Sequence, residues 1–409
     1  MSGYILGRRG RTSRAFGFTD AVRPASQDLI TYSGEGHIIT FAPTGTGKTS
    51  GPVICNALTH PGQLIVLDMK GEVHAATAQA RRNMGQQVHV LDLRDGVESG
   101  SLNPLELAAQ SGDDIAAIAR SFAAELIDRS PDERDPFWSN WAETMIAGGV
   151  TWLLGDCDAE KLKLSKLFDL FTADDPSYAI AVLLDGKKDK VTHRSARAAF
   201  ASLLNLPSEN TRPSVLGTVQ SHLRLFDSDL VRRLTDTSSI DIDGFIAGEP
   251  MSIYIIVPPQ RLEAYSPLLR MWISGLILAM TQRKNLPKER TLMLCDEIGN
   301  LGRIDALLTA ATLLRSFGLT LWCFFQNAAQ LSIYGPQANT LVDNAGVVQL
   351  FGVKNHRMAQ DLANLIGGIS PEELLKMPYD QQVILIDGKL NRASQVRHYS
   401  DRHFAATKT

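Results

Sequence analysis

The sequence predicts an α/β protein whose mostly parallel central sheet is interrupted by an all-α insertion. Short runs rich in β-branched residues recur along the chain, and the stretches between them are long enough for crossover helices. Such runs nearly vanish between about residues 106 and 212, where apolar residues recur at helical spacing instead. The 409 residues include 44% hydrophobic and 21% charged side chains, which is the composition of an ordinary globular protein of two or three domains.

The N-terminal range 1–36 is predicted to be a basic arm. Its first 34 residues hold five arginines against two aspartates, a net charge of +3. Two interpretations stay open: a solvated arm, or a segment that contacts phosphate groups or an acidic partner. The range is too basic and too broken to be a secretory signal.

Eight segments are predicted to be strands, three before the insertion and five after it. They are 37–42, 63–69 and 87–93, then 251–258, 291–297, 319–325, 346–353 and 382–388. Amphipathic helices lie between them, for example 303–315. The sheet domain is therefore expected in two parts, 37–105 and 215–409, around a helical insertion at 106–214.

The insertion carries two charged segments. The range 106–135 holds eight carboxylates against three arginines, and 185–197 holds five basic residues against two acidic ones. A run of like charges is usually a solvated helix face, and DNA contact by 185–197 is the alternative. The net charge of −3 excludes a globally basic surface, so any DNA contact has to come from a local patch or the inner surface of a ring.

No segment is expected to cross a membrane, and the four cysteines fit an intracellular protein. The longest apolar stretches, 145–154 and 268–280, fall short of the roughly 20 residues that a spanning helix needs. The cysteines form no C-x-x-C pair, which fits a reducing environment.

The strongest motif is APTGTGKT, residues 42–49, directly after the first predicted strand of the sheet domain. It matches the phosphate-loop pattern G-x-x-x-x-G-K-[ST] except that Ala42 replaces the first glycine. Glycines let the backbone turn and point its N–H groups inward, and a helix beginning at 48–49 adds the positive end of its dipole. We expect the following residues to bind a nucleotide: Thr44, Gly45, Thr46, Gly47, Lys48, Thr49 and Ser50.

Lys48 and Thr49 have specific expected roles within this loop. Lys48 is expected to reach the β- and γ-phosphates, and the Thr49 hydroxyl to ligate Mg²⁺. The chain lacks the N-K-x-D signature of guanine recognition. The expected ligands are therefore ATP and Mg²⁺.

Two adjacent acids, Asp296 and Glu297, end the apolar strand 291–297. Ligands bind at the carboxyl edge of parallel sheets, so we expect both acids to face the phosphate loop. Asp296 suits the Mg²⁺ contact that such a carboxylate makes. Glu297 is expected to act as the general base that polarises an attacking water.

Gln326 and Arg315 bracket the next strand, 319–325. Gln326 either touches the γ-phosphate or the water and senses the nucleotide state, or is an ordinary amide at a strand end. Arg315 closes the helix 303–315, where a cation complements the helix C-terminus. The alternative is an arginine finger that reaches the γ-phosphate of a neighbouring subunit.

Together these motifs resemble the coupling-protein ATPases of type IV secretion and bacterial conjugation, the TraG-like group. The matching segments are GEGHIITFAPTGTGKTSG (34–51), LIVLDMKGE (64–72), SLNPLE (101–106), LMLCDEIGNLGRI (292–304) and RSFGLTLWCFFQNAAQLSIYG (315–335). With weaker similarities they extend in the expected order from residue 34 to about residue 390.

The resemblance implies a RecA-like P-loop NTPase with an inserted all-α domain, ring-shaped homo-hexamers when active, and ATP hydrolysis stimulated by DNA. It places nucleotide and Mg²⁺ binding at Lys48 and Thr49 and hydrolysis at Asp296 and Glu297. It implies phosphate sensing by Gln326, and Arg315 resembles the inter-subunit arginine of the group.

One difference concerns the membrane. Members of the group usually carry an N-terminal transmembrane anchor, whereas only about 36 residues precede the first predicted strand. Either a separate membrane-anchoring protein docks the chain or it is a diverged soluble relative. We expect a cytoplasmic protein, peripheral at the cytoplasmic face of the bacterial inner membrane, that is monomeric when isolated.

The function expected from the sequence is an ATP-hydrolysing coupling protein, a DNA-translocating motor. It would recruit single- or double-stranded DNA, or a relaxase–DNA complex, and deliver it to type IV secretion components. One alternative is a receptor for secreted protein substrates that uses ATP as an assembly switch. The other is a DNA translocase of the FtsK/HerA kind.

Overall fold

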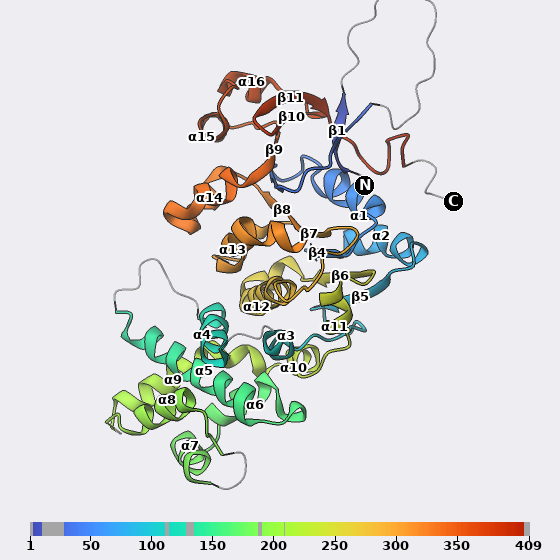
Figure 1. Cartoon of the computed structure of the whole chain (residues 1–409). Helices are drawn as coiled ribbons and strands as arrows, with labels where there is room; N and C mark the ends of the chain where they lie inside the picture. The colour runs from blue at the N-terminus through green and yellow to red at the C-terminus, as the bar shows by residue number, and fades with distance from the viewer. Residues whose placement is uncertain are drawn as a thin grey trace, which may run out of the picture. The chain divides into compact units, whose positions relative to one another are not determined.

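The computed structural model describes residues 3–9, 28–110, 114–127, 135–186, 190–207 and 209–404. They divide into two compact units (Figure 1). The sheet unit comprises residues 1–89, 247–259 and 284–409, and the helical unit comprises residues 90–246 and 260–283. The helical unit is larger than the range 106–214 expected from the sequence, because helices continue well beyond residue 214.

Eleven described strands form one sheet in the order β2-β1-β11-β10-β9-β3-β8-β7-β4-β6-β5. All neighbours from β9 through β3, β8, β7 and β4 to β6 pair in parallel, which confirms the predicted α/β fold with a mostly parallel central sheet. The bounds are β3 His37–Phe41, β4 Leu64–Asp68, β5 Gln87–Asp92, β6 Met251–Ile256, β7 Thr291–Cys295, β8 Leu319–Phe325 and β9 Ala345–Phe351.

Beyond β9 the sheet continues with antiparallel strands that the sequence analysis largely missed. β10 (Gln381–Ile386) was predicted, but β11 (Lys389–Ser394), β1 (Tyr4–Arg9) and β2 (Leu29–Tyr32) were not. The range 1–36 is therefore not simply an arm. Its apolar start, Tyr4–Leu6, is buried in the sheet. Arg11, Arg14 and Arg23 lie outside the described residues, so the phosphate-contact interpretation of the arm stays a prediction.

Helices cover both faces of the sheet unit. Figure 1 shows α1 (Ile54–Thr59) and α2 (Glu72–Asn83) on one side of the central strands and α13 (Asp305–Leu313) and α14 (Ala338–Asp343) on the other. The helices α15 (His356–Ile366) and α16 (Pro371–Lys376) lie between β9 and β10 in the chain. The central strands are buried along their length, so they read as continuous apolar runs rather than as alternating ones.

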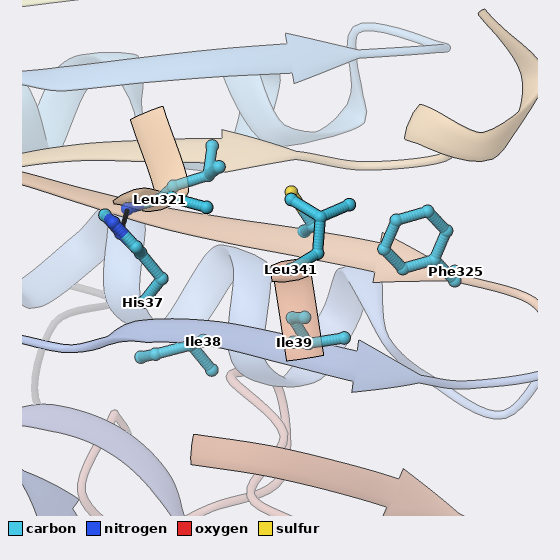
Figure 2. A pocket seen from close by; sticks show the side chains of 8 residues that line it. His37, Ile38, Ile39, Leu321, Phe325 and Leu341 are labelled. Carbon is cyan, nitrogen blue, oxygen red and sulfur yellow. Dashed lines mark hydrogen bonds between the residues drawn. The ribbon is translucent and has the colours of Figure 1, made fainter. Parts of the chain in front are cut away.

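A small apolar cavity lies within this core (Figure 2). It is lined by His37, Ile38, Ile39, Ala311, Leu321, Cys323, Phe325 and Leu341. His37 Nδ1 accepts a hydrogen bond from the backbone N–H of Leu321 at 3.1 Å, and His37 Nε2 lies 3.0 Å from the carbonyl oxygen of Ala310. The ring is therefore neutral with its proton on Nε2, and it joins β3 to β8 and α13. This cavity is a packing feature of the core.

The helical unit is built from ten helices among the described residues. They are α3 Pro104–Ala109, α4 Ile115–Leu126, α5 Phe137–Asp156, α6 Leu164–Phe171, α7 Pro176–Asp185, α8 Arg194–Leu204, α9 Thr211–Leu223, α10 Asp229–Thr235, α11 Ile242–Ala247 and α12 Leu262–Met280. The side chains of Trp152 and Leu153 on α5 are fully buried. In the charged segment 185–197, residues 187–189 lie outside the described residues, so its contact with DNA stays a prediction.

None of the described helices is long and apolar enough to cross a membrane. The 19-residue helix α12 carries Arg270, which is 6% exposed. Its guanidinium donates to the carbonyl oxygen of Glu125 at 3.0 and 2.8 Å. A buried cation satisfied in this way belongs to a packed protein core.

Candidate nucleotide-binding site

The phosphate loop follows β3 at the carboxyl edge of the sheet. The Ala42 N–H donates to the carbonyl oxygen of Phe325 at 2.9 Å, which fixes the loop against β8. Gly45 and Gly47 have φ values of +78° and +92°, a backbone conformation that favours glycine. Among the described residues, no hydrogen-bond acceptor pairs with the backbone N–H groups of Gly45, Gly47 and Lys48. Backbone N–H groups left without acceptors in such a loop are the donors that a phosphate-binding concavity needs.

The helix after the loop is shorter and less regular than expected. A wide turn at Thr49–Val53 contains Pro52 and also Gly51, whose φ is −96° and ψ −109°, and the six-residue α1 comes next. A Cβ on Gly51 would lie 2.9 Å from the carbonyl oxygen of Val396, so only glycine fits there. The backbone N–H groups, rather than a long helix dipole, therefore supply most of the anion-binding potential.

The structure brings Lys48, Thr49, Asp296 and Glu297 together. The Thr49 hydroxyl donates to Asp296 Oδ2 at 2.9 Å. The Lys48 ammonium forms an ion pair with Glu297 and lies 3.7 Å from Asp296 Oδ1. Lys48 and Asp296 are 7% and 5% exposed. The Lys48 ammonium is therefore already paired with two carboxylates, and any anion that binds it has to compete with them.

Glu297 adopts an unusual backbone conformation directly after β7. Its φ of 56° and ψ of 30° are left-handed, which costs a non-glycine residue about 1–3 kcal/mol. Its carboxylate is held by Lys48, by the Gln326 amide at 2.6 Å and by the Asn300 amide at 3.3 Å. These contacts offset the backbone strain and aim the carboxylate at the loop.

Gln326 lies at the end of β8, which neighbours β7 in the sheet, so the structure places it beside Glu297. Two residues around it, Asn300 and Gln330, were not predicted from the sequence. Gln330 accepts from the Gln326 backbone N–H at 2.6 Å and donates to Asn300 at 3.2 Å. Both Asn300 and Gln330 fall inside the segments 292–304 and 315–335, which carry the motif resemblance. Their roles could not be predicted from the sequence, because Asn300 and Gln330 act through a hydrogen bond between the loop after β7 and the loop after β8.

Asp296 has a strongly perturbed acidity. Burial raises its pKa to about 6, against the opposing effect of the Lys48 charge, and Glu297 raises it further. Its Oδ1 is buried and has no hydrogen-bond partner among the described residues. A carboxylate that accepts from the Thr49 hydroxyl with one oxygen and has no hydrogen bond to the other fits an Mg²⁺ ligand.

The described residues contain no group of three or more His, Cys, Asp or Glu side chains able to hold a metal. A phosphate-loop Mg²⁺ site needs none, because phosphate oxygens and waters fill most of the coordination positions. Thr49 and Asp296 are the protein ligands that such a site would use.

Arg315 lies at the opposite edge of the sheet from the loop. It precedes the amino end of β8, its side chain is 58% exposed, and its guanidinium lies 3.6 Å from Glu35. Arg315 is therefore not part of the group formed by Lys48, Asp296, Glu297 and Gln326. Two of the expected roles remain for Arg315. It is either a cation at the end of a helix or an arginine finger that acts at the site of another subunit.

Comparison with known proteins places this geometry in context. The family described as "Type IV secretory system Conjugative DNA transfer" matches residues 15–369. The conjugal transfer protein TraG of Escherichia coli is 24% identical over 360 residues, covering 83% of this chain and 56% of TraG. Protein VirD4 of Rhizobium rhizogenes is 23% identical over 415 residues, covering 92% of this chain and 60% of VirD4. The chain thus spans a little over half the length of these curated relatives.

Solved structures show the same fold. The bacterial conjugative coupling protein TrwBdeltaN70, in its unbound monoclinic form, superposes with a TM-score of 0.71 at 14% identity, covering 97% of this chain and 96% of that one. TrwB in complex with the non-hydrolysable ATP analogue ADPNP superposes with a TM-score of 0.68, also at 14% identity, covering 97% and 95%. The RecA-like P-loop fold implied by the motifs is therefore confirmed.

Proposed function

The chain belongs to the type IV secretory system conjugative DNA transfer family, and from that premise we propose that it is an ATP-hydrolysing coupling protein. It uses ATP and Mg²⁺ to move DNA, or a relaxase–DNA complex, toward a type IV secretion or conjugation apparatus. The observation that carries this proposal is the meeting of Lys48, Thr49, Asp296, Glu297 and Gln326 at one edge of the sheet.

ATP binding starts with an exchange of partners at Lys48. The backbone N–H groups of Gly45, Gly47 and Lys48 hold phosphate oxygens, and the Lys48 ammonium moves from Glu297 to the β- and γ-phosphates. Mg²⁺, when bound by Thr49 and Asp296, supplies charge neutralisation of the phosphates. The binding step therefore also releases the carboxylate that the reaction needs.

The released Glu297 carboxylate takes a proton from the attacking water. Its left-handed backbone and its bonds to Gln326 and Asn300 keep it at the loop after Lys48 leaves. The Gln326 amide, 2.6 Å from Glu297 Oε2, is placed to orient that water or to contact the γ-phosphate. Binding and base release are thus coupled through one lysine.

Arg315 fits a role in trans. Because it is exposed at the edge of the sheet opposite its own loop, it acts only at the site of an adjacent copy, as an arginine finger in a homo-hexamer. Its alanine variant should bind ATP normally and turn over at least 10-fold more slowly in the assembled ring. Full turnover in a ring verified by sedimentation would remove Arg315 from the mechanism.

The partners proposed for the motor are DNA, relaxase or secreted protein substrates, and type IV secretion components. A separate membrane-anchoring protein would hold it at the cytoplasmic face of the bacterial inner membrane. These assignments rest on family membership and on no contact in the structure.

DNA dependence of ATP hydrolysis tests the proposal. Turnover is measured without DNA, with single-stranded DNA and with double-stranded DNA, for the chain and for Lys48→Ala. We expect DNA to stimulate turnover and Lys48→Ala to abolish it. If DNA neither binds the chain nor stimulates its turnover, the protein-receptor alternative is supported. If duplex DNA stimulates turnover and relaxase has no effect, a translocase of the FtsK/HerA kind is supported.

A further inference from the structure

Two residues from the C-terminal part of the sheet unit touch the phosphate loop. Tyr379 follows α16, and its hydroxyl donates to the carbonyl oxygen of Gly45 at the tip of the loop. Arg397 follows β11, and its Nη2 donates to the carbonyl oxygen of Thr46 at 3.4 Å. The sequence predicted neither contact, because more than 300 residues separate the partners.

The segment around Arg397 continues along the loop toward α1. The backbone N–H of His398 donates to the carbonyl oxygen of Ser50 at 3.1 Å. A Cβ on Gly47 would lie 2.9 Å from Arg397 Cζ, so the guanidinium packs directly on the glycine that closes the phosphate cradle. The position of Arg397 is therefore fixed with respect to the loop.

Arg397 also contacts two tyrosines. We call Tyr379, Arg397 and Tyr399 the tyrosine–arginine cluster. Arg397 Cζ lies 4.8 Å from the centre of the Tyr379 ring, and Arg397 Nη1 donates to the Tyr399 hydroxyl at 3.1 Å. Among the described residues no carboxylate forms an ion pair with Arg397. The cation is held by the face of the Tyr379 ring and by neutral oxygens, so no described carboxylate neutralises its charge.

The position of the cluster matches one end of a nucleotide. The γ-phosphate end lies at Lys48, Glu297 and Gln326, so the nucleoside end has to leave the loop away from these groups. No described hydrogen bond or ion pair connects the cluster to Glu297 or Gln326. Tyr379 and Tyr399 are 54% and 52% exposed, which is high for aromatic side chains.

We propose that the tyrosine–arginine cluster is the subsite for the base and ribose of the bound nucleotide. An exposed tyrosine ring stacks on the base, and Arg397 acts as a positioning residue that fixes both rings against the loop. Stacking recognises the face of a base rather than its hydrogen-bonding edge, so the subsite takes purine nucleotides with little discrimination between adenine and guanine. This proposal rests on the proposed function, since it concerns the other end of the same ligand.

Competition binding separates this subsite from the phosphate site. A fluorescent ADP analogue is displaced by ADP, GDP or inorganic tripolyphosphate in the presence of Mg²⁺, for the chain and for Tyr399→Ala, Arg397→Ala and Tyr379→Phe. Loss of one stacked ring weakens base binding about 10-fold. We expect Tyr399→Ala and Arg397→Ala to weaken the binding of ADP and GDP by about that factor. The binding of tripolyphosphate should weaken by less than about twofold. Tyr379→Phe keeps the ring but loses the hydroxyl that donates to Gly45, so it should bind both nucleotides more tightly than Arg397→Ala does.

Arg392→Ala is the matched control, because Arg392 on β11 is exposed, pairs with Glu373 and does not touch the loop. The proposal is overturned if Tyr399→Ala and Arg397→Ala leave ADP affinity unchanged. It is also overturned if they weaken tripolyphosphate and ADP equally, since the cluster would then only support the loop. Failure of the proposed function looks different: the unmodified chain would bind neither ligand, or Lys48→Ala would bind both normally.

Discussion

At the scale of single residues, the site depends on which partner Lys48 has. The ammonium is shared between Glu297 and Asp296 in this structure, and a triphosphate offers it a stronger partner. Removing the Glu297 charge should therefore help binding while it removes the general base. A variant that lacks the Glu297 charge should therefore bind ATP well and hydrolyse it poorly.

Glu297→Gln should bind ATP at least as tightly as the unmodified chain and hydrolyse it about 100-fold more slowly or worse. Glutamine keeps the length of the side chain and its contact with Gln326, but it neither pairs with Lys48 nor accepts a proton. Isothermal titration and a phosphate-release assay check the two parts. Weakened binding together with normal turnover would contradict the roles given to both residues.

Asp296→Asn should separate stability from function. Burial raises the folded-state pKa of Asp296 to about 6 from an ordinary value near 3.9, so its stability contribution is full below pH 3.9 and is lost as pH rises through 6. Removing the charge should therefore raise the free energy of unfolding by about 3 kcal/mol at pH 8 and change it little at pH 4. Urea titrations at both pH values check this, and nucleotide binding by the variant should no longer tighten with Mg²⁺.

At the scale of elements, the phosphate loop contacts the parallel strands and the antiparallel edge of the sheet. The parallel strands were easier to predict from the sequence than the antiparallel edge. β3, β7 and β8 were predicted because buried parallel strands are continuous apolar runs, and their carboxyl ends carry the loop, the two acids and Gln326. The antiparallel edge was mostly missed, because β11, KLNRAS, has neither an apolar run nor a clean alternation. Tyr379 and Arg397 belong to this edge, and their contacts with the loop depend on long-range pairing.

Asn56 on α1 joins the loop helix to the missed strand β1. Its side-chain oxygen accepts from the Ile5 N–H at 2.8 Å, and its amide donates to the Ile5 carbonyl oxygen at 2.9 Å. Asn56→Ala leaves two buried backbone groups unpaired and should lower the free energy of unfolding by about 2–4 kcal/mol. Asn391→Ala, in the exposed β10–β11 hairpin, is the control and should change it by less than about 0.5 kcal/mol. Equal effects in chemical denaturation would show that β1 does not support the loop helix.

At the scale of the whole molecule, the sequence predicted two structural parts but placed their boundaries too narrowly. The loss of strand signals indicated a helical part, yet periodicity alone could not show that α10, α11 and α12 continue it after residue 214. An apolar helix such as α12 fits a sheet protein as well as a helical unit, and only its contacts decide between them. The same limit applies to Arg315, whose partner in this chain is Glu35 and whose proposed partner is another copy.

Stability should fall at acid pH because two core histidines are buried as neutral rings. Burial lowers the pKa of His37 and of His60 to about 4, below the ordinary value of 6.5. Their contribution to stability is therefore full above pH 6.5 and is lost as pH falls through 4, at about 1.4 kcal/mol per pH unit for each ring. Between pH 4 and 6 Asp296 opposes one of them, which leaves a net loss of about 1.4 kcal/mol per unit from these three groups.

Urea titrations between pH 4.5 and 5.5 measure that slope. His37→Gln removes one titrating ring and should reduce the slope by about 1.4 kcal/mol per pH unit, whatever it does to stability at pH 7. An unchanged slope would show that His37 is protonated in the folded protein or equally neutral in both states.

The central claim is that the phosphate loop and the acids at 296 and 297 form one nucleotide site governed by Lys48. Calorimetric titration of a non-hydrolysable ATP analogue with Mg²⁺ into the chain, Lys48→Ala and Lys389→Ala tests it most directly, since Lys389 is an exposed lysine on β11. We expect one binding site per chain that Lys48→Ala abolishes and Lys389→Ala leaves intact. Binding by Lys48→Ala as tight as that of the unmodified chain would contradict it.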